Sequence, residues 1–347
     1  MLVVSFHGGA TGINNLAAYE TPSGALLTDT ALAEPATVPL SELRGLTVEN
    51  NQLYVANGAK ATSQVLCYGL PDSAGACAFV SLVIGPTVTN SKGHFETCVA
   101  HPFGIAFNGP DACFVSNQDT NTVALVTITG NSGSLGGGSQ SAYLTETFPA
   151  GVFLDGTFVA SQQGALHGVK IAAQDVPQTD GGLGVSTKPD GGKILNSVRD
   201  VAVANGILFV ADEVDATINM YALADGTFLG ASARLGKSPT HLSIAGDGLY
   251  VSAGSSLLWS ALPSSAGGPR LSLEPIQVSV PAGNKIGGIS FNGDTVYVPF
   301  QTGTGGVNPG GSIDSFTVST SAPPAFSNQA TLVSGLTDTP EFVLFVE

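Results

Sequence analysis

Charged residues are scarce in this chain. Only 11% of its 347 residues are Asp, Glu, Lys or Arg, against roughly 25% in an ordinary globular protein. Basic residues are the scarcer kind: 11 Lys and Arg stand against 26 Asp and Glu, which gives a formal net charge of −15. Because binding to a nucleic-acid backbone depends on basic side chains, we expect no nucleic-acid partner.

Long apolar runs are also missing. No stretch of 18 apolar residues occurs, whereas a membrane-spanning helix needs about 20, so we expect no membrane partner. Residues 1–6 follow a strand pattern and lack a secretion signal. The low Lys content nevertheless favours an extracellular protein, so we expect a secreted monomer whose signal has been removed.

Cysteine is rare, with four in the chain. Cys67 and Cys77 flank an expected hairpin connection, where a cross-strand disulfide is geometrically plausible. Cys98 and Cys113 are separated by a whole expected strand, and we expect them not to pair with each other. The chain also lacks a Gly-x-Ser-x-Gly elbow, a His-Glu-x-x-His pair and a Walker lysine, which removes the motif-based case for an α/β hydrolase, a zincin or a phosphate-binding loop.

What the chain does contain is Gly, with 45 residues, and an internal repeat. Each copy has a short apolar strand, a turn rich in Gly, Asn or Asp, and a second strand of the form aromatic-Val-small. Six copies are complete, and half-copies stand at the two termini. The complete copies pair 45–48 with 53–57, 104–107 with 113–117, 151–154 with 157–160, 200–203 with 208–212, 241–244 with 249–252, and 288–291 with 296–299.

The repeat predicts an all-β fold. Its copies start 41 to 59 residues apart and together account for the whole chain, and a unit of about this size is a propeller blade. We therefore predict one domain over 1–347, a seven-bladed β-propeller with four-stranded antiparallel blades. The terminal half-copies, at 2–6 and 340–345, are expected to share the seventh blade and so close the ring.

The second copy, HPFGIAFNG at 101–109 continuing to CFVSNQDTNTV at 113–123, resembles the YVTN/NHL type of β-propeller. That family includes binding scaffolds and enzymes, among them virginiamycin B lyase, carboxymuconate lactonising enzymes and secreted lyases acting on rhamnose-glucuronate sugars. The resemblance implies a propeller and makes lyase chemistry attractive, because these enzymes act on lactones, muconates and uronates.

Scarce basic side chains fall at one predicted face. In each blade, the first strand starts at one face of the propeller and the second strand ends at that same face. Residues at first-strand starts and at second-strand ends therefore surround one mouth of the channel. All five His and two of the four Arg map there. The residues that we select are Arg44, His101, Arg199, His241, Lys285 and Glu341 at first-strand starts; His7, Asn117, Asp212 and Gln301 at second-strand ends; and His94 and His167 in neighbouring loops.

These residues suggest a site for an anion, most simply a carboxylate. Arg44 and Arg199 would neutralise it and stabilise the enolate-like charge that forms when the α-proton leaves. His241 or His101 would remove that proton, with no cofactor required. The leading hypothesis is therefore a lyase that performs β-elimination on a small-molecule or oligosaccharide carboxylate, with a uronate-containing glycan preferred.

Structural explanations and two other functions stay open. Each His can be a satisfied hydrogen-bonding residue, each Arg can bridge blades, and Glu341 can pair with such an Arg. The acidic stretch at 212–215 can be a solvated loop or can bind Ca²⁺ or Mg²⁺. One alternative function is a non-catalytic carbohydrate- or protein-binding propeller. The other is a lactonase using a divalent metal held by Glu341, Asp212 and a His.

Overall fold

Among the residues that the computed structural model describes, all regular elements are strands. The described residues are 1–7, 13–35, 39–58, 63–85, 87–89, 95–97, 99, 101–118, 122–135, 144–145, 153–154, 157–158, 197–223, 228–265, 271–302 and 310–347. Across these ranges no helix is long and apolar enough to cross a membrane.

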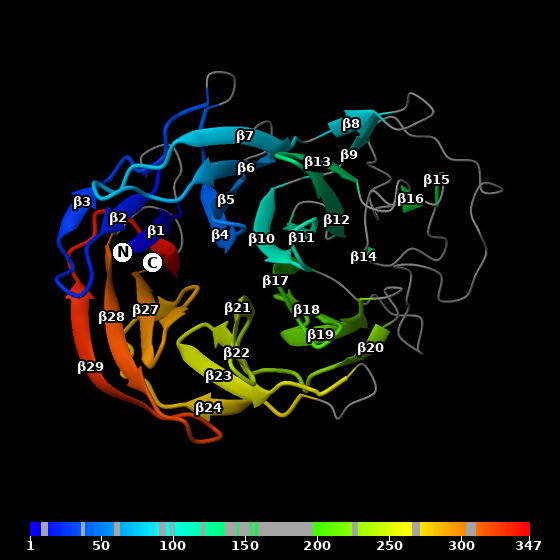
Figure 1. The fold of residues 1–347 in the computed structure, drawn as a ribbon. Helices are drawn as coiled ribbons and strands as arrows, with labels where there is room; N and C mark the ends of the chain where they lie inside the picture. The colour runs from blue at the N-terminus through cyan, green and yellow to red at the C-terminus, as the bar shows by residue number, and fades with distance from the viewer. Residues whose placement is uncertain are drawn as a thin grey trace.

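Six antiparallel sheets stand as blades around a central channel (Figure 1). We number the blades along the chain and give their strands from the channel outward. Blade 1 consists of β4 (Leu43–Glu49), β5 (Gln52–Asn57), β6 (Gln64–Gly69) and β7 (Phe79–Ile84). Blade 2 consists of β10 (Pro102–Phe107), β11 (Ala112–Asn117), β12 (Thr122–Thr129) and β13 (Ser132–Leu135). Blade 3 consists of β17 (Val198–Ala204), β18 (Ile207–Asp212), β19 (Thr217–Ala222) and β20 (Phe228–Ala231).

The other three blades follow the same plan. Blade 4 consists of β21 (Pro239–Ala245), β22 (Gly248–Ala253), β23 (Ser256–Ala261) and β24 (Glu274–Ile276). Blade 5 has a divided inner strand, β25 (Asn284–Ile286) and β26 (Ser290–Asn292), followed by β27 (Thr295–Thr302), β28 (Gly311–Val318) and β29 (Phe326–Val333). Blade 6 consists of β30 (Pro340–Phe345), β1 (Leu2–Phe6), β2 (Ala17–Tyr19) and β3 (Leu26–Thr28). The remaining strands are β8 (Thr87–Thr89), β9 (Phe95–Thr97), β14 (Leu144–Thr145), β15 (Phe153–Leu154) and β16 (Thr157–Phe158).

The predicted closure of the ring by the two chain ends is confirmed. β30 is the inner strand of blade 6 and pairs antiparallel with β1, from Leu2 opposite Phe345 onward. The amino terminus of Met1 also donates a hydrogen bond to the carbonyl oxygen of Val346, at 2.9 Å. Main-chain hydrogen bonds therefore hold the ring together where the chain begins and ends.

The predicted number of seven blades is wrong: the described residues form six. β10 of blade 2 contacts β17 of blade 3 directly, and the Ser116 hydroxyl donates to the carbonyl oxygen of Arg199 across this interface. No blade separates them. In the expected copy at 151–160, β15 and β16 pair only with each other. These two strands of two residues each match the sequence pattern of a blade but do not form one.

The hydrophobic core is divided among the interfaces between blades. Six clusters of buried residues occur, and each combines residues of two neighbouring blades. Between blades 2 and 3, for example, Phe114 and Val123 pack against Leu208 and Val210. Because the apolar side chains lie on the blade faces, the innermost edges are left to carry the residues that project into the channel.

The cysteines of blade 1 point into different parts of this core. Cys67 lies in the cluster shared with blade 2, whereas Cys77 lies in the cluster shared with blade 6. Both thiols are free and buried, as is that of Cys113. The disulfide that the spacing made plausible is therefore absent, because the two side chains face opposite sides of one sheet. Cys98 lies outside the described residues.

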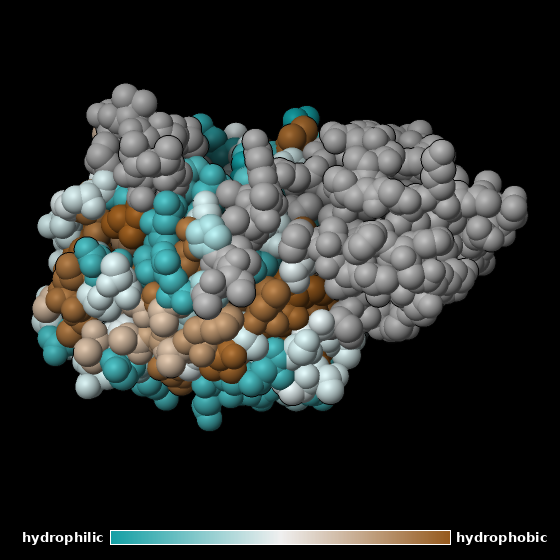
Figure 2. All heavy atoms as spheres, turned by 90° about the horizontal axis from the view of Figure 1, so that it is seen from above, coloured by the Kyte–Doolittle hydropathy of each residue, from teal (hydrophilic) through white to brown (hydrophobic). Residues whose placement is uncertain are grey.

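The outer surface carries apolar residues on two neighbouring blades. Leu26 and Leu27 of β3, and Phe79, Val80 and Leu82 of β7, are exposed. Figure 2 shows several apolar patches on this side of the molecule, separated by hydrophilic residues rather than joined into one surface.

Candidate functional site

A backbone irregularity interrupts all six inner strands at the same level of the channel. β4, β10, β17 and β21 each shift register against their second strand, β30 shifts against β1, and the inner strand of blade 5 is divided there. Such bulges re-aim side chains and occur often beside functional sites. Each irregularity contains or adjoins two residues that form two layers across the channel.

We call these the rim layer and the plug layer. The rim layer lies toward the predicted mouth, and the plug layer lies next to it along the channel. The rim layer consists of Arg44, Phe103, Arg199, Thr240, Gly287 and Glu341, in blade order. The plug layer consists of the residues that follow them, Gly45, Gly104, Asp200, His241, Gly288 and Phe342.

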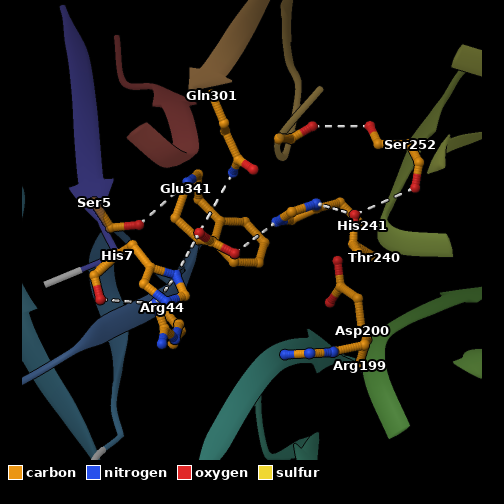
Figure 3. Close-up of polar contacts among 12 residues, drawn as sticks. Ser5, His7, Arg44, Arg199, Asp200, Thr240, His241, Ser252, Gln301 and Glu341 are labelled. Carbon is orange, nitrogen blue, oxygen red and sulfur yellow. Dashed lines mark hydrogen bonds and ion pairs between the residues drawn. The ribbon is translucent and has the colours of Figure 1, made fainter. Parts of the chain in front are cut away.

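Glu341 is the centre of the polar contacts in the rim layer (Figure 3). Its Oε2 lies 3.1 Å from His7 Nδ1 and accepts a hydrogen bond from Gln301 Nε2 at 3.4 Å. Its Oε1 lies 3.4 Å from His241 Nε2. Although burial alone would raise its pKa, hydrogen bonds from His241 and His7 and the charge of Arg44 hold the pKa of Glu341 well below the ordinary 4.5. Glu341 is therefore an ionised carboxylate in contact with two imidazoles.

His7 is the accessible member of this group. Its side chain is 37% exposed, against 8% for Glu341 and 2% for His241. Arg44 Nη1 lies 2.9 Å from His7 Nδ1 and also donates to the main-chain oxygen of His7. Arg44 can only donate and an ionised Glu341 can only accept, so their contacts with Nδ1 require opposite tautomers of His7. Arg44 also has the main-chain oxygen of His7 and Glu42 as acceptors, and in the tautomer protonated at Nδ1 the proton is donated to Glu341. The ring's Nε2 is then left as an acceptor.

An acidic residue that the sequence analysis missed joins two of the selected basic residues. Glu42 Oε2 lies 3.3 Å from Arg44 Nη2 and 3.4 Å from His101 Nε2. Glu42 and His101 both have positive φ, 50° and 54°, a backbone conformation that costs about 1 to 3 kcal/mol in a non-glycine residue. Such strain is common at functional sites, where the surrounding structure sustains it.

Phe103 connects the two arginines. The guanidinium carbon of Arg44 lies 5.9 Å from its ring centroid and that of Arg199 lies 5.4 Å away, both within cation–π range. Arg199 Nε also donates to Glu213 Oε2 at 2.7 Å. Arg44, Arg199, His101 and His241 thus lie near one another, with the two arginines in the rim layer, His241 in the plug layer and His101 just before β10. The expected excess of positive charge is not present, because Glu42, Glu213 and Glu341 accompany the basic groups.

The plug layer closes the channel beneath the rim. The His241 ring lies 4.6 Å from that of Phe342 and 5.5 Å from that of Phe103. His241 Nδ1 also lies 2.9 Å from the Thr240 hydroxyl (Figure 3). Because its Nδ1 lies at the Thr240 hydroxyl, its Nε2 faces Glu341 at 3.4 Å and only 2% of its side chain is exposed, His241 has the environment of a structural residue. Its predicted role as the base of a lyase does not fit this placement.

Asp200 completes the plug. Val201 and Leu242 donate their main-chain N–H groups to its two carboxylate oxygens, at 2.8 and 2.9 Å. Burial raises the pKa of Asp200 from 3.8 to about 6, although the neighbouring His241 and these two hydrogen bonds oppose the shift. Asp200 was not among the selected residues. Its signal in the sequence is a carboxylate at a position where four other copies have Gly.

The other predicted residues lie apart from the cluster or act locally. Lys285 is exposed and lines a groove with Lys237 between blades 4 and 5. Asn117 is buried at the end of β11, opposite Pro102. Asp212 Oδ1 accepts the N–H groups of Val214 and Asp215, which explains its place at a turn. His94 and His167 lie outside the described residues.

The metal set proposed from the sequence is not assembled. Asp212 caps its turn, whereas Glu341 is held by imidazole and amide groups. In the described part of the chain, no group of three or more His, Cys, Asp or Glu side chains is arranged to hold a metal ion. These residues therefore do not fit the divalent cation of the metal-dependent lactonase hypothesis.

Comparison with solved structures supports the fold. A protein from Lactobacillus plantarum has a TM-score of 0.55 and 14% identity, over 96% of this chain and 82% of that one. A "putative 6-phosphogluconolactonase" from Bacteroides uniformis has a TM-score of 0.50 and 12% identity, over 95% and 80%. One of the same description from Bacteroides fragilis also has a TM-score of 0.50 and 12% identity, over 100% and 98%. No family model and no curated protein matches the chain, so the YVTN/NHL resemblance stays a prediction.

Proposed function

We propose that this propeller hydrolyses a lactone that carries an anionic group, at the rim layer of the channel. The observation that carries the proposal is the pair formed by Glu341 and His7. A buried ionised carboxylate lies 3.1 Å from Nδ1 of a partly exposed imidazole. A carboxylate in this position fixes the tautomer and the orientation of an imidazole that acts as a general base.

The reaction follows from this arrangement. His7 Nε2 takes a proton from a water molecule while the oxygen of that water attacks the lactone carbonyl carbon. The tetrahedral intermediate then breaks its ring C–O bond, and the leaving alkoxide takes the proton back from the imidazolium of His7. The product is a hydroxy acid, and Glu341 stabilises the imidazolium between the two proton transfers.

Arg199 is the proposed partner of the substrate's anionic group. Its side chain is 20% exposed, against 4% for Arg44, so its guanidinium is the more accessible of the two. Phe103 and Glu213 hold it in place. A guanidinium binds carboxylate or phosphate through paired hydrogen bonds. The likeness in fold to two proteins described as 6-phosphogluconolactonases makes a phosphorylated sugar lactone the first substrate to test.

The same geometry gives less support to the lyase hypothesis. β-Elimination needs an imidazole that reaches the α-carbon of a bound carboxylate. His241 is buried, with its ring nitrogens facing Thr240 and Glu341, and His101 Nε2 faces Glu42. Hydrolysis needs only a water molecule at His7, the most exposed imidazole of the cluster.

The experiment is a pH-stat assay of 6-phosphoglucono-δ-lactone and of its neutral analogue glucono-δ-lactone, with spontaneous hydrolysis subtracted. We expect saturable hydrolysis with a preference for the phosphorylated lactone. His7→Gln should lower kcat by roughly 100-fold or more, the usual contribution of a general base. Arg199→Ala should abolish the preference and leave hydrolysis of the neutral lactone nearly unchanged.

Lys285→Gln is the matched control, because it removes an exposed positive charge outside the cluster and should change neither rate. Failure of the wild-type protein to accelerate either lactone would overturn the proposal. Full activity of a folded His7→Gln variant would remove His7 from the mechanism.

A further inference from the structure

The channel has a cavity on the side of the plug away from the rim layer. It has a volume of about 390 Å³, within the range of small-molecule sites. The cavity is lined by the residues that follow the plug-layer residue on each of the six inner strands. It is therefore the half of the channel that lies beyond the plug. Phe107, Phe291 and Phe345 belong to its wall, and Asp200 belongs to its plug-layer end.

Among the described residues, the lining of the cavity contains many apolar residues and a single charged one. Residues with apolar side chains predominate among those that line it, and one glycine and three hydroxyl residues are present. Of these, Ser243 donates to the carbonyl oxygen of Ile289, and Ser290 accepts the N–H of Phe345. Asp200 is the one charged residue among the described residues that line the cavity. A carboxylate has about four acceptor positions, and main-chain groups use two of those of Asp200.

We propose that this cavity binds a small organic cation, an ammonium group attached to an apolar or aromatic body. The ammonium would donate to Asp200, and the attached organic group would lie against the residues of the inner strands that line the cavity. The proposal is separate from lactone hydrolysis, because it concerns the opposite side of the plug and its test requires no turnover.

The surroundings of Asp200 favour a cation over an anion. His241 from β21 and Glu341 from β30 are the titratable groups whose charges act on it. Gly104 of β10 brings no side chain, and Arg199 on its own strand lies over Phe103 in the rim layer. An anion entering this cavity would meet the carboxylate, which no lysine or arginine of the lining offsets.

The test is isothermal titration calorimetry at pH 8 with benzylammonium chloride as the probe and benzyl alcohol as its neutral isostere. We expect the wild-type protein to bind benzylammonium at least tenfold more tightly than benzyl alcohol. Asp200→Asn should weaken benzylammonium binding by roughly 10- to 100-fold, the contribution of a hydrogen bond to a charged group. Asp247→Asn, at an exposed turn, removes the same charge and should have no effect.

Ala106→Phe tests the location independently of Asp200. Ala106 lines the cavity, and a phenyl group there should occupy the space of the probe and abolish binding. Equal affinity for the cation and the alcohol, or binding that survives Ala106→Phe, would overturn the proposal. So would the absence of binding to the wild-type protein, an outcome that requires no variant to fold.

Discussion

Gly104 lies directly against the carboxylate of Asp200, so closely that a Cβ at position 104 would overlap Asp200 Oδ1. Gly288 stands in the same relation to Phe342, whose ring occupies the place of its missing side chain. Glycines thus alternate with large residues around part of the plug layer. The channel can be closed by Asp200, His241 and Phe342 because three of their neighbours have no side chain.

Substitution of Gly104 tests this packing. Gly104→Ala should destabilise the protein by about 1 to 3 kcal/mol, the usual cost of adding a methyl group to a filled site. Urea denaturation measures the change. Gly236→Ala is the control, because a Cβ there meets no atom within 4 Å and the residue has no positive φ. Equal midpoints for the two variants would show that the plug tolerates a side chain at 104.

The raised pKa of Asp200 predicts a dependence of stability on pH. Because its folded-state pKa, about 6, exceeds the ordinary 3.8, the folded protein favours the protonated acid, and stability falls as pH rises between about 4 and 6. Asp200→Asn cannot ionise. Its stability relative to wild type should therefore increase by up to about 3 kcal/mol between pH 4 and pH 7, as measured by urea denaturation at each pH. A difference that does not vary with pH would contradict the assignment.

Glu341 should show the opposite behaviour. Its pKa is lowered in the folded protein, so its ionised form contributes stability above pH 4.5, and this contribution is lost as pH falls through the folded-state value. Glu341→Gln should therefore be less stable than wild type at pH 7, and the gap should narrow in acid. A gap that stays constant down to the acid unfolding of the wild type would show that the Glu341 charge contributes nothing.

Much of the fold could be predicted from the sequence, because strand and turn patterns are local. The repeat gave the inner and second strands, and the half-copies gave the shared blade. The number of blades could not be counted in this way, since Phe153–Leu154 and Thr157–Phe158 follow the pattern without forming one. The nearness of the selected basic residues at one end of the inner strands was predictable, because the start of an inner strand and the end of its neighbour share a face.

The partners of those residues were not predictable. Glu42 reaches His101 from another blade, a contact that no local pattern encodes. Register shifts also go unseen in a sequence, so the division of Arg44 and Gly45 between two layers could not be predicted. One signal was available: four of the six complete copies have Gly at the position of Gly45, whereas another has Asp200. The replacement of Gly by Asp marks a repeat position at which the side chain differs in function between blades.

The buried cysteines give a further prediction. Burial raises the pKa of Cys77 and Cys113 to about 12 and also raises that of Cys67, and thiols react as thiolates. Iodoacetamide at pH 8 should therefore leave all three unmodified in the folded protein and label them in urea, as read by peptide mass spectrometry. A disulfide between Cys67 and Cys77 would appear instead as two residues that resist labelling in urea until they are reduced.

The most direct test of the proposed chemistry is a double-mutant cycle on His7 and Glu341, with kcat/KM for the phosphorylated lactone as the readout. If Glu341 acts through His7, the variant carrying both His7→Gln and Glu341→Gln should be about as slow as His7→Gln alone, since the carboxylate has no imidazole left to orient. Losses that simply multiply would show that the two residues act independently, and would contradict the carboxylate–imidazole pair as the hydrolytic base.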